Sequence, residues 1–398
     1  MSEWLSEDLI FSGDQYYKSV LDAIAHAKEQ IDFETYIFDD DGIGKQFESA
    51  LTAAAGRGVR VRLIVDGFGA SQWSERNALK LARSGVDVRI YHPVRWSRIW
   101  SKLFSRLLMR FRGIRHHATS RGRSFFGNLN RRNHRKIVIV DGARAWVGSL
   151  NISAVHSEKF SGALAWRDTA AALAINPNTP PPVPLEALQS AFEFVYQRAH
   201  RFNTKGRLVR IRRRRFKFRA QTSLIFRLNY TLLLRRRHHH ELAQIVRAAK
   251  SKIWITNAYL APSKQMMRRL RAAAERGVDV RILLPRKSDV FFMPWVAGAH
   301  YGPLLRSGVR IFEYLPRFLH AKSVVIDHWA IVGSSNLNRR SMLKDFEVDV
   351  VLSRDASRLE LEAQFARDLE LASEIHEAPG GIRSFLGRLI TVFMKDLI

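Results

Sequence analysis

The sequence contains no cysteine among its 398 residues. A disulfide framework, a thiolate metal site and a cysteine nucleophile are therefore excluded. Apolar runs of roughly 18 residues, which a membrane-spanning helix requires, are also missing, so we expect none. Residues 1–8 carry three acidic side chains and no apolar core, unlike a signal peptide. These absences predict a protein of the reducing cytoplasm.

Acidic residues are missing from two long segments. Residues 94–136 hold 13 Lys and Arg, residues 201–237 hold 14, and neither segment contains an acid. Together they account for nearly all of the formal net charge of +28, so the rest of the chain is close to neutral. Such a distribution predicts a polyanionic partner, either nucleic acid or an anionic lipid surface.

Helical and strand patterns alternate in an order that occurs twice. In the first half, helices are expected at residues 14–28, 47–57 and 77–83, and strands at 31–38, 59–65 and 86–91. Residues 272–281 repeat the pattern of 53–62, while 241–250 and 253–260 repeat the first helix and strand. We predict an α/β fold with two duplicated domains, 1–200 and 222–398, joined by a basic linker, 201–221. Each domain should have a mixed, mostly parallel sheet flanked by helices.

The first half contains an insertion of 37 residues just before His134. Within it, residues 94–130, apolar side chains recur at helical spacing between cations. This pattern favours a helix lying in an anionic membrane interface, and an ordinary core-facing helix is the alternative. The expected membrane-contacting residues are Trp96, Ile99, Trp100, Leu103, Phe104 and Leu107. A second amphipathic stripe, in 382–397, fits either a membrane-contacting helix or a C-terminal packing helix.

Two stretches, 134–151 and 320–336, carry the residues suited to chemistry. Each starts with a His and a Lys two positions apart, His134 with Lys136 and His320 with Lys322. The following β-branched runs indicate strands, in which residues two apart point to the same side. Two such half-sites facing each other would surround one anion with two imidazoles and two ammonium groups.

That set of groups suits transfer of a phosphodiester. The reaction needs cations for the phosphoryl oxygens, a nucleophile and an acid for the leaving group. One His can attack phosphorus and the other can move the proton, so we expect neither a cofactor nor a metal. Asn151 and Asn336 could donate to a phosphoryl oxygen. Asp168 and Glu347, downstream in each half, are the candidates to orient the histidines.

Both stretches resemble the HxKxxxxD…GSxN motif of the phospholipase D superfamily, in which two-domain members carry two copies. The resemblance implies that His134 is the nucleophile, that His320 is the general acid and base, and that Asp168 and Glu347 orient them. The motif carboxylates are mostly structural supports in that family. The residues carried over are His134, Lys136, Asp141, His320, Lys322 and Asp327, with Ser149, Asn151, Ser334 and Asn336 expected to bind phosphate.

Within the superfamily the chain is most similar to bacterial cardiolipin synthases. Residues 34–35, 42–46, 166–169 and 258–262 carry the similarity, besides the two motifs. It implies transfer of a phosphatidyl group between phosphatidylglycerol molecules through a phosphohistidine, releasing glycerol and forming cardiolipin. A peripheral location on the cytoplasmic face of the cell membrane is expected.

A hydrolase, a nuclease or another phosphodiesterase would share this site. A nuclease would explain the charge but not the apolar stripe of the insertion. The arginine run 212–215 has few aromatic neighbours for base stacking, so nucleic acid is disfavoured as a partner. A non-catalytic membrane or nucleic-acid binder is disfavoured by two intact motif copies. The consecutive histidines 238–240 are read as a solvated basic segment and not as a metal site.

Overall fold

A computed structural model of the chain describes residues 4–71, 73, 75–93, 131–175, 185–210, 225–380, 386–387 and 389–390. The predicted insertion helix in 94–130, with its six membrane-contacting residues, lies outside these residues, as does most of the stripe in 382–397. No helix in the described part of the chain is long and apolar enough to cross a bilayer.

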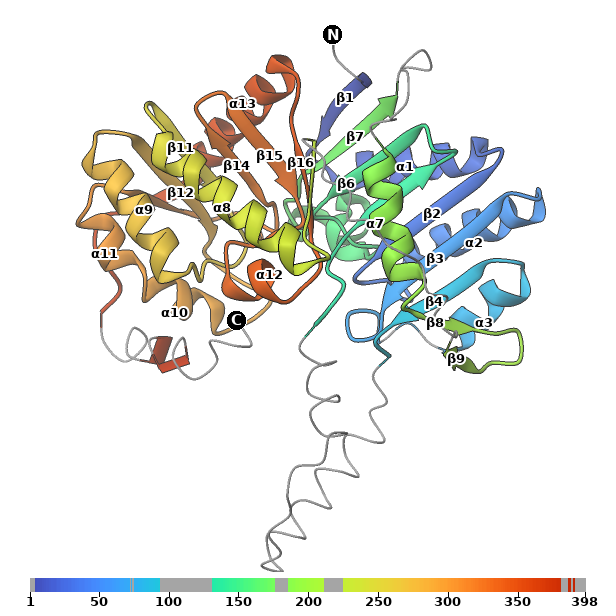
Figure 1. Cartoon of the computed structure of the whole chain (residues 1–398). Coiled ribbons are helices and arrows are strands. Elements are labelled where there is room, and N and C mark those ends of the chain that lie inside the picture. Colours follow the sequence, from blue (N-terminus) through green and yellow to red (C-terminus); the bar gives the residue numbers. More distant parts are fainter. Residues whose placement is uncertain are drawn as a thin grey trace, which may run out of the picture.

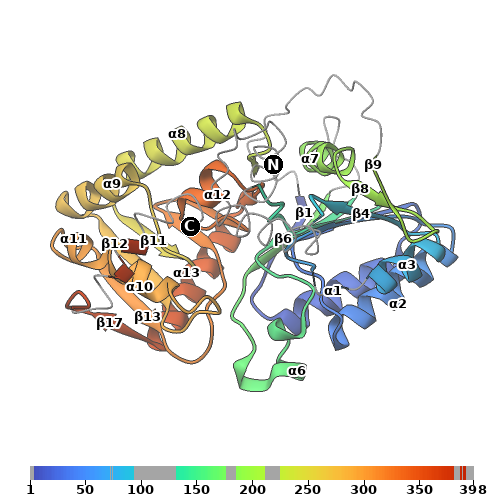
Figure 2. The ribbon, with the colours of Figure 1, turned by 90° about the horizontal axis from the view of Figure 1, so that it is seen from below.

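The first domain is built on a nine-stranded sheet, counted over the described residues, in the order β1-β7-β6-β5-β2-β3-β4-β8-β9. Helices α1, α2 and α3 lie on one face of this sheet and α7 on the other (Figure 2). The elements are β1 (Trp4–Ile10), α1 (Gly13–His26), β2 (Gln30–Thr35), α2 (Gly42–Gly56), β3 (Arg60–Asp66), α3 (Glu75–Arg83), β4 (Asp87–Tyr91), β5 (Ile137–Val140), β6 (Arg144–Gly148), the short α6 (Glu158–Ser161), β7 (Ala170–Ile175), α7 (Glu186–Tyr196), β8 (His200–Phe202) and β9 (Leu208–Arg210).

The second domain repeats this plan with an eight-stranded sheet, β10-β16-β15-β14-β11-β12-β13-β17. Its inner order, β16 to β13, matches β7 to β4 of the first domain, which confirms the duplication (Figure 1). The elements are β10 (Phe226–Leu228), α8 (Leu232–Ala248), β11 (Lys252–Thr256), α9 (Lys264–Glu275), β12 (Asp279–Pro285), α10 (Met293–Gly298), α11 (Tyr301–Leu305), β13 (Arg310–Tyr314), β14 (Ser323–Ile326), β15 (Trp329–Gly333), α12 (Arg339–Leu343), β16 (Val348–Val351), α13 (Asp355–Glu370) and β17 (Ala372–Ile375).

The α/β class is confirmed, but the sheets are mostly antiparallel and not mostly parallel as predicted. Only β2-β3-β4 and β11-β12-β13 pair in parallel. The difference arises because each motif forms a hairpin, β5-β6 or β14-β15, and the next strand returns antiparallel beside it. Two boundaries also differ from prediction. The strands β8 and β9 add the first ten residues of the expected linker to the first sheet, and α8 begins at Leu232, so the histidines 238–240 are helical.

The motif aspartates lie in the hairpin turns, at the far end of β5 and β14 from the histidines. Asp141 and Asp327 have φ angles of 51° and 50°, a region in which Asp is among the more tolerated non-glycine residues. The Asp141 carboxylate accepts three backbone N–H groups, from residues 28–30, and Asp327 accepts three from residues 250–252. This arrangement agrees with the structural role implied by the resemblance.

The two domains share a continuous apolar core. One buried cluster includes Trp4 and Ile137 of the first domain together with Phe226 and Val348 of the second. Buried polar contacts reinforce the boundary, for example the ion pair between Arg167 and Asp368, 2.9 Å apart. Burial of apolar surface is the main stabilising contribution to such a boundary. The domains are therefore held as one unit with a fixed seam.

Part of the basic excess is structural. Arg132 and Arg135, at the end of the first basic segment, are buried and face Asp66 and Glu34 at 3.6 and 2.8 Å. Arg227, in the second basic segment, is buried and pairs with Glu241 at 2.7 Å. Buried cations need such partners because an unpaired charge is expensive to desolvate. These arginines are therefore not available to a polyanionic partner.

Candidate active site

The two motif histidines lie at the seam between the domains. The backbone N–H of His134 donates to Phe346 O at 3.0 Å, and that of His320 donates to Arg167 O at 2.8 Å. Each contact places a histidine of one domain beside the segment that carries the orienting carboxylate of the other. The isolated bridges Asn133–Phe346 and Arg167–Leu319 repeat the same pairing one residue earlier. Backbone hydrogen bonds across the seam thus fix both half-sites.

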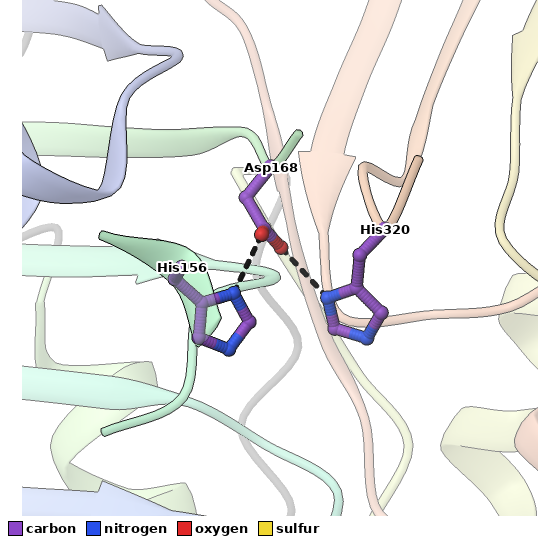
Figure 3. Close-up of side chains that lie close together, drawn as sticks. All are labelled: His156, Asp168 and His320. Atoms are coloured by element: carbon purple, nitrogen blue, oxygen red, sulfur yellow. Dashed lines mark hydrogen bonds and ion pairs between the residues drawn. The ribbon is translucent and has the colours of Figure 1, made fainter. Parts of the chain in front are cut away.

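Each histidine is oriented by the carboxylate of the opposite domain. His134 Nδ1 lies 3.0 Å from Glu347 Oε2, and His320 Nδ1 lies 2.7 Å from Asp168 Oδ1 (Figure 3 shows the second pair). The sequence predicted that these carboxylates would orient histidines, and the structure brings each pair together across the domain boundary. With both Nδ1 atoms engaged, Nε2 remains the atom of each ring for chemistry.

The two motif serines support the carboxylates. Ser149 Oγ donates to Asp168 Oδ1 at 2.7 Å, and Ser334 Oγ donates to Glu347 Oε2 at 2.5 Å. Both serines are fully buried. Their hydroxyl protons are thus committed to carboxylates, so the structure replaces the expected phosphate-binding role of the serines with a positioning role.

The motif asparagines differ in their contacts. Asn151 Oδ1 accepts the backbone N–H of Ile37 at 3.2 Å. Asn336 Oδ1 is buried and has no hydrogen-bond partner among the described residues. Aromatic rings form the adjacent walls, with Tyr36 4.9 Å from the His134 ring and Trp166 5.2 Å from the His320 ring.

Two buried lysines supply the cationic groups of the site. Lys136 Nζ donates to His134 O at 2.7 Å, and Lys322 Nζ donates to His320 O. Burial lowers the pKa of Lys136 to about 7, with repulsion from Lys322 adding to the effect, and burial lowers the pKa of Lys322 to about 8. Burial, Lys136 and Lys322 also hold the pKa of His134 well below its usual value. A bound phosphodiester would place a negative charge next to these groups and so raise their pKa values.

The pKa values of the two orienting carboxylates are shifted in opposite directions. Burial alone would raise the pKa of Asp168, but His156 and His320 beside it bring the pKa well below its usual value. Burial raises the pKa of Glu347 to about 7, although Lys136, Ser334 and Ser341 each oppose the rise. Asp168 is therefore the firmly ionised member of the pair.

His156 accounts for this difference, and the sequence analysis missed it. Its Nδ1 lies 2.6 Å from Asp168 Oδ2, opposite His320 (Figure 3). Its Nε2 lies 3.4 Å from the backbone N of Asn151, which can only donate, so the proton of the neutral ring is on Nδ1 and points to Asp168. The corresponding residue of the second domain is Ser341, whose Oγ accepts the N–H of Asn336 at 3.3 Å. The only sequence signal is a shared position, five residues after each motif asparagine.

His156, Asp168 and His320 are also the one group in the described part of the chain with the composition and spacing of a metal site, their nearest ligand atoms lying within 4.8 Å of one another. Nδ1 of each imidazole, however, faces the Asp168 carboxylate directly, at 2.6 Å from His156 and 2.7 Å from His320. Both distances are those of hydrogen bonds. The arrangement fits a His–Asp–His hydrogen-bonded chain.

A His, a Lys and an opposing carboxylate from each of two duplicated domains, all around one cationic centre, define a phospholipase D-like phosphodiester-transfer enzyme. The family described as "Cardiolipin synthase, PLD-like domain" matches residues 20–159 and 242–369. Cardiolipin synthase B of Escherichia coli K12 is 32% identical over 349 residues, which are 86% of this chain and 75% of that protein. Cardiolipin synthase of Clostridium perfringens strain 13 is 30% identical over 393 residues, covering 96% of this chain and 74% of that protein.

The chain therefore belongs to the cardiolipin synthase family, and it is a phosphatidyltransferase of the phospholipase D superfamily that acts on phospholipids. The crystal structure of phosphatidylserine synthase from Haemophilus influenzae superposes with a TM-score of 0.67 at 11% identity, covering 98% of this chain and 94% of that one. At that identity the likeness establishes the shared fold alone.

Proposed function

We propose that the protein is a cardiolipin synthase that moves a phosphatidyl group from one phosphatidylglycerol to another and releases glycerol. The observation that carries this proposal is the pair of crossed histidine–carboxylate contacts, together with two buried lysines, at a single seam. One phosphodiester can meet all of these groups at once. The family relatives, both cardiolipin synthases by name, support the choice of lipid.

In the first step, His134 Nε2 attacks phosphorus and the bond from phosphorus to the glycerol oxygen breaks. His320 Nε2–H gives its proton to the departing oxygen, while Lys136 and Lys322 compensate the phosphoryl charge. In the second step, the hydroxyl of another phosphatidylglycerol gives its proton to His320 and its oxygen attacks phosphorus. The nitrogen–phosphorus bond breaks and its electron pair returns to His134. Splitting one displacement into two in this way is covalent catalysis.

The carboxylates favour this division of roles. A general acid must carry a proton, and the ionised Asp168 stabilises the imidazolium form of His320. Burial and Lys322 keep the pKa of His320 well below its usual value. The bound phosphodiester anion would oppose both effects and favour protonation. His134 faces the less acidic Glu347, which suits a ring that must be neutral to attack.

We further propose that the enzyme works as a peripheral protein on the cytoplasmic face of the cell membrane. The support comes from the sequence of 94–130, in which Trp, Phe and Leu recur at helical spacing between Lys and Arg residues, and which contains no acidic residue. Such a segment suits a surface that contains phosphatidylglycerol.

Incubation with phosphatidylglycerol vesicles tests the reaction. Cardiolipin and glycerol should appear in equal amounts, and a chelator should leave the rate unchanged because no step uses a metal. Thin-layer analysis of the lipid products and an enzymatic glycerol assay provide the measurements. Phosphatidic acid as the sole lipid product would replace the proposal with a hydrolase.

A further inference from the structure

A continuous basic groove runs between helices α8 and α9 on the second domain. It consists of two adjoining cavities of about 640 and 390 Å³, which share Gln265 and Arg269. Volumes of this order suit a small-molecule headgroup. None of the residues that line either cavity is acidic. The lining arginines include Arg236, Arg268 and Arg269.

These arginines lack partners. Within the described part of the chain, the guanidinium groups of Arg236, Arg268 and Arg269 make no hydrogen bond to any residue and no ion pair with an acid. Nη1 of Arg269 is buried and unsatisfied. Nearby acids are engaged elsewhere, since Glu241 pairs with Arg227. Unlike the buried arginines of the seam, the groove arginines therefore present uncompensated charge.

The local potential is positive enough to act on a neighbouring histidine. Burial lowers the pKa of His239, and Arg269 beside it lowers the pKa further. An anion in the groove would reverse the electrostatic part of this effect and gain hydrogen bonds from several planar guanidinium groups, which match phosphate geometry.

One end of the groove is apolar and lies at the start of α8. Leu232 and Leu343 line it and are 65% and 48% exposed, and the neighbouring Leu233 is 70% exposed. Asn229, just before α8, accepts the backbone N–H of Glu347 at 2.7 Å, so the chain leading into α8 contacts the segment that carries this active-site carboxylate. Exposed leucines beside unpaired arginines fit a lipid better than a nucleic acid, since neither cavity is lined by Trp, Tyr or Phe for base stacking.

We propose that the groove between α8 and α9 binds the headgroup of an anionic phospholipid in the bilayer, with Leu232 and Leu233 entering the interface. The second domain would then dock on the membrane through a site separate from the catalytic residues. This inference rests on the proposed lipid chemistry and adds a second point of contact with lipid. It involves residues of the described part only, independent of the segment 94–130.

The test uses the full-length double variant Arg236→Gln/Arg269→Gln. Its partition onto phosphatidylcholine vesicles containing about one third phosphatidylglycerol should weaken by about 25-fold, because each of the two cations near an anionic surface contributes roughly fivefold. The matched control is Arg60→Gln/Arg83→Gln, which removes the same charge from exposed positions of the first domain. The control should bind the vesicles within about twofold of the wild type.

Turnover of a soluble diester, bis(p-nitrophenyl) phosphate, should be unchanged in both variants, which separates docking from chemistry. Unaltered vesicle binding in the groove variant would overturn the proposal. An equal loss in the control would overturn it too, since the effect would then be one of net charge. Loss of single-stranded DNA binding with unchanged vesicle binding would identify the groove as a nucleic-acid site. If the wild type makes no cardiolipin but the groove variant still loses vesicle binding, the proposed reaction fails and the docking site stands.

Discussion

The strongest consequence of the site geometry concerns His156, which touches no reacting atom and acts through Asp168. His156→Ser gives the first domain the residue type that the second has at Ser341, and it removes the 2.6 Å hydrogen bond to Asp168 Oδ2. Asp168 would keep Ser149 and His320 as partners. With one donor fewer, Asp168 should become more basic and hold the imidazolium of His320 in a less fixed position.

The size of the effect follows from the bond that is lost. A hydrogen bond to a charged group contributes about 1.5–3 kcal/mol, which corresponds to roughly 10- to 150-fold in rate if the loss falls on the transition state. The loss should fall where His320 must protonate a poor leaving group. Release of glycerol from phosphatidylglycerol needs that proton, whereas release of p-nitrophenolate needs it far less.

The assay therefore compares two substrates. With phosphatidylglycerol, kcat of His156→Ser should fall by about 10- to 150-fold, and with bis(p-nitrophenyl) phosphate by less than about threefold. His156→Asn, whose amide can still donate to Asp168, should recover part of the lost rate. Thermal unfolding of each variant shows whether the fully buried site tolerates the change. An equal fall with both substrates would mean that His156 is only structural, and no fall with either would refute the proposed chain from His156 to His320.

Three further predictions follow from the same contacts. His134→Ala should abolish formation of an acid-labile phosphoenzyme, measured with a radiolabelled donor. His320→Ala should slow turnover of phosphatidylglycerol by about 10²–10⁴-fold while leaving release of p-nitrophenolate from the soluble diester largely intact. Detection of a phosphoenzyme in His134→Ala would reverse the roles of the two histidines. Because burial lowers the pKa of Lys136 to about 7, the folded state releases a proton that the unfolded state keeps up to about pH 10, so stability should rise with pH between about 7 and 10. Lys136→Met should make the rise of Tm with pH less steep, with Lys322, whose pKa is lowered to about 8, accounting for the rise that remains, and an unchanged profile would contradict the assignment. Asp141→Ala should cost about 1–3 kcal/mol of unfolding free energy in denaturant titrations, since three backbone N–H donors lose their acceptor, and should leave kcat per folded molecule within about threefold, so a selective loss of kcat would argue for a catalytic role.

Much of this fold was predictable because local patterns repeat. The alternation around Ile31 and Val61, and the β-branched run from Ile137, predicted strands that the structure contains. Because the domain is duplicated, each pattern occurs twice in the sequence, and the order of elements in the second domain could be inferred from the first. Strand direction was not predictable in the same way, because hydrophobic alternation is identical in parallel and antiparallel strands. The sheets were consequently expected to be mostly parallel, and they are not.

The basic segments show the limit of counting charge. Arg135 and Arg227 look like the other cations around them in sequence, yet they are buried against Glu34 and Glu241. Arg236 and Arg269 instead line the groove between α8 and α9, where their guanidinium groups face no acidic side chain among the lining residues. Only distances to acids that are remote in sequence distinguish a structural arginine from one that is available to a ligand.

The residue types that make up the site can be identified from the sequence. Spacing paired His134 with Lys136 and His320 with Lys322, just before the strands β5 and β14, and the chemistry of these groups indicated phosphodiester transfer. The contacts among these residues appear only in the folded protein. Glu347 orients His134 and Asp168 orients His320, and His156 makes a further hydrogen bond to Asp168 only. The reason is physical, because a hydrogen bond depends on a few ångströms and a direction in space. Residues 152 or 213 positions apart acquire both only when two domains pack along one seam.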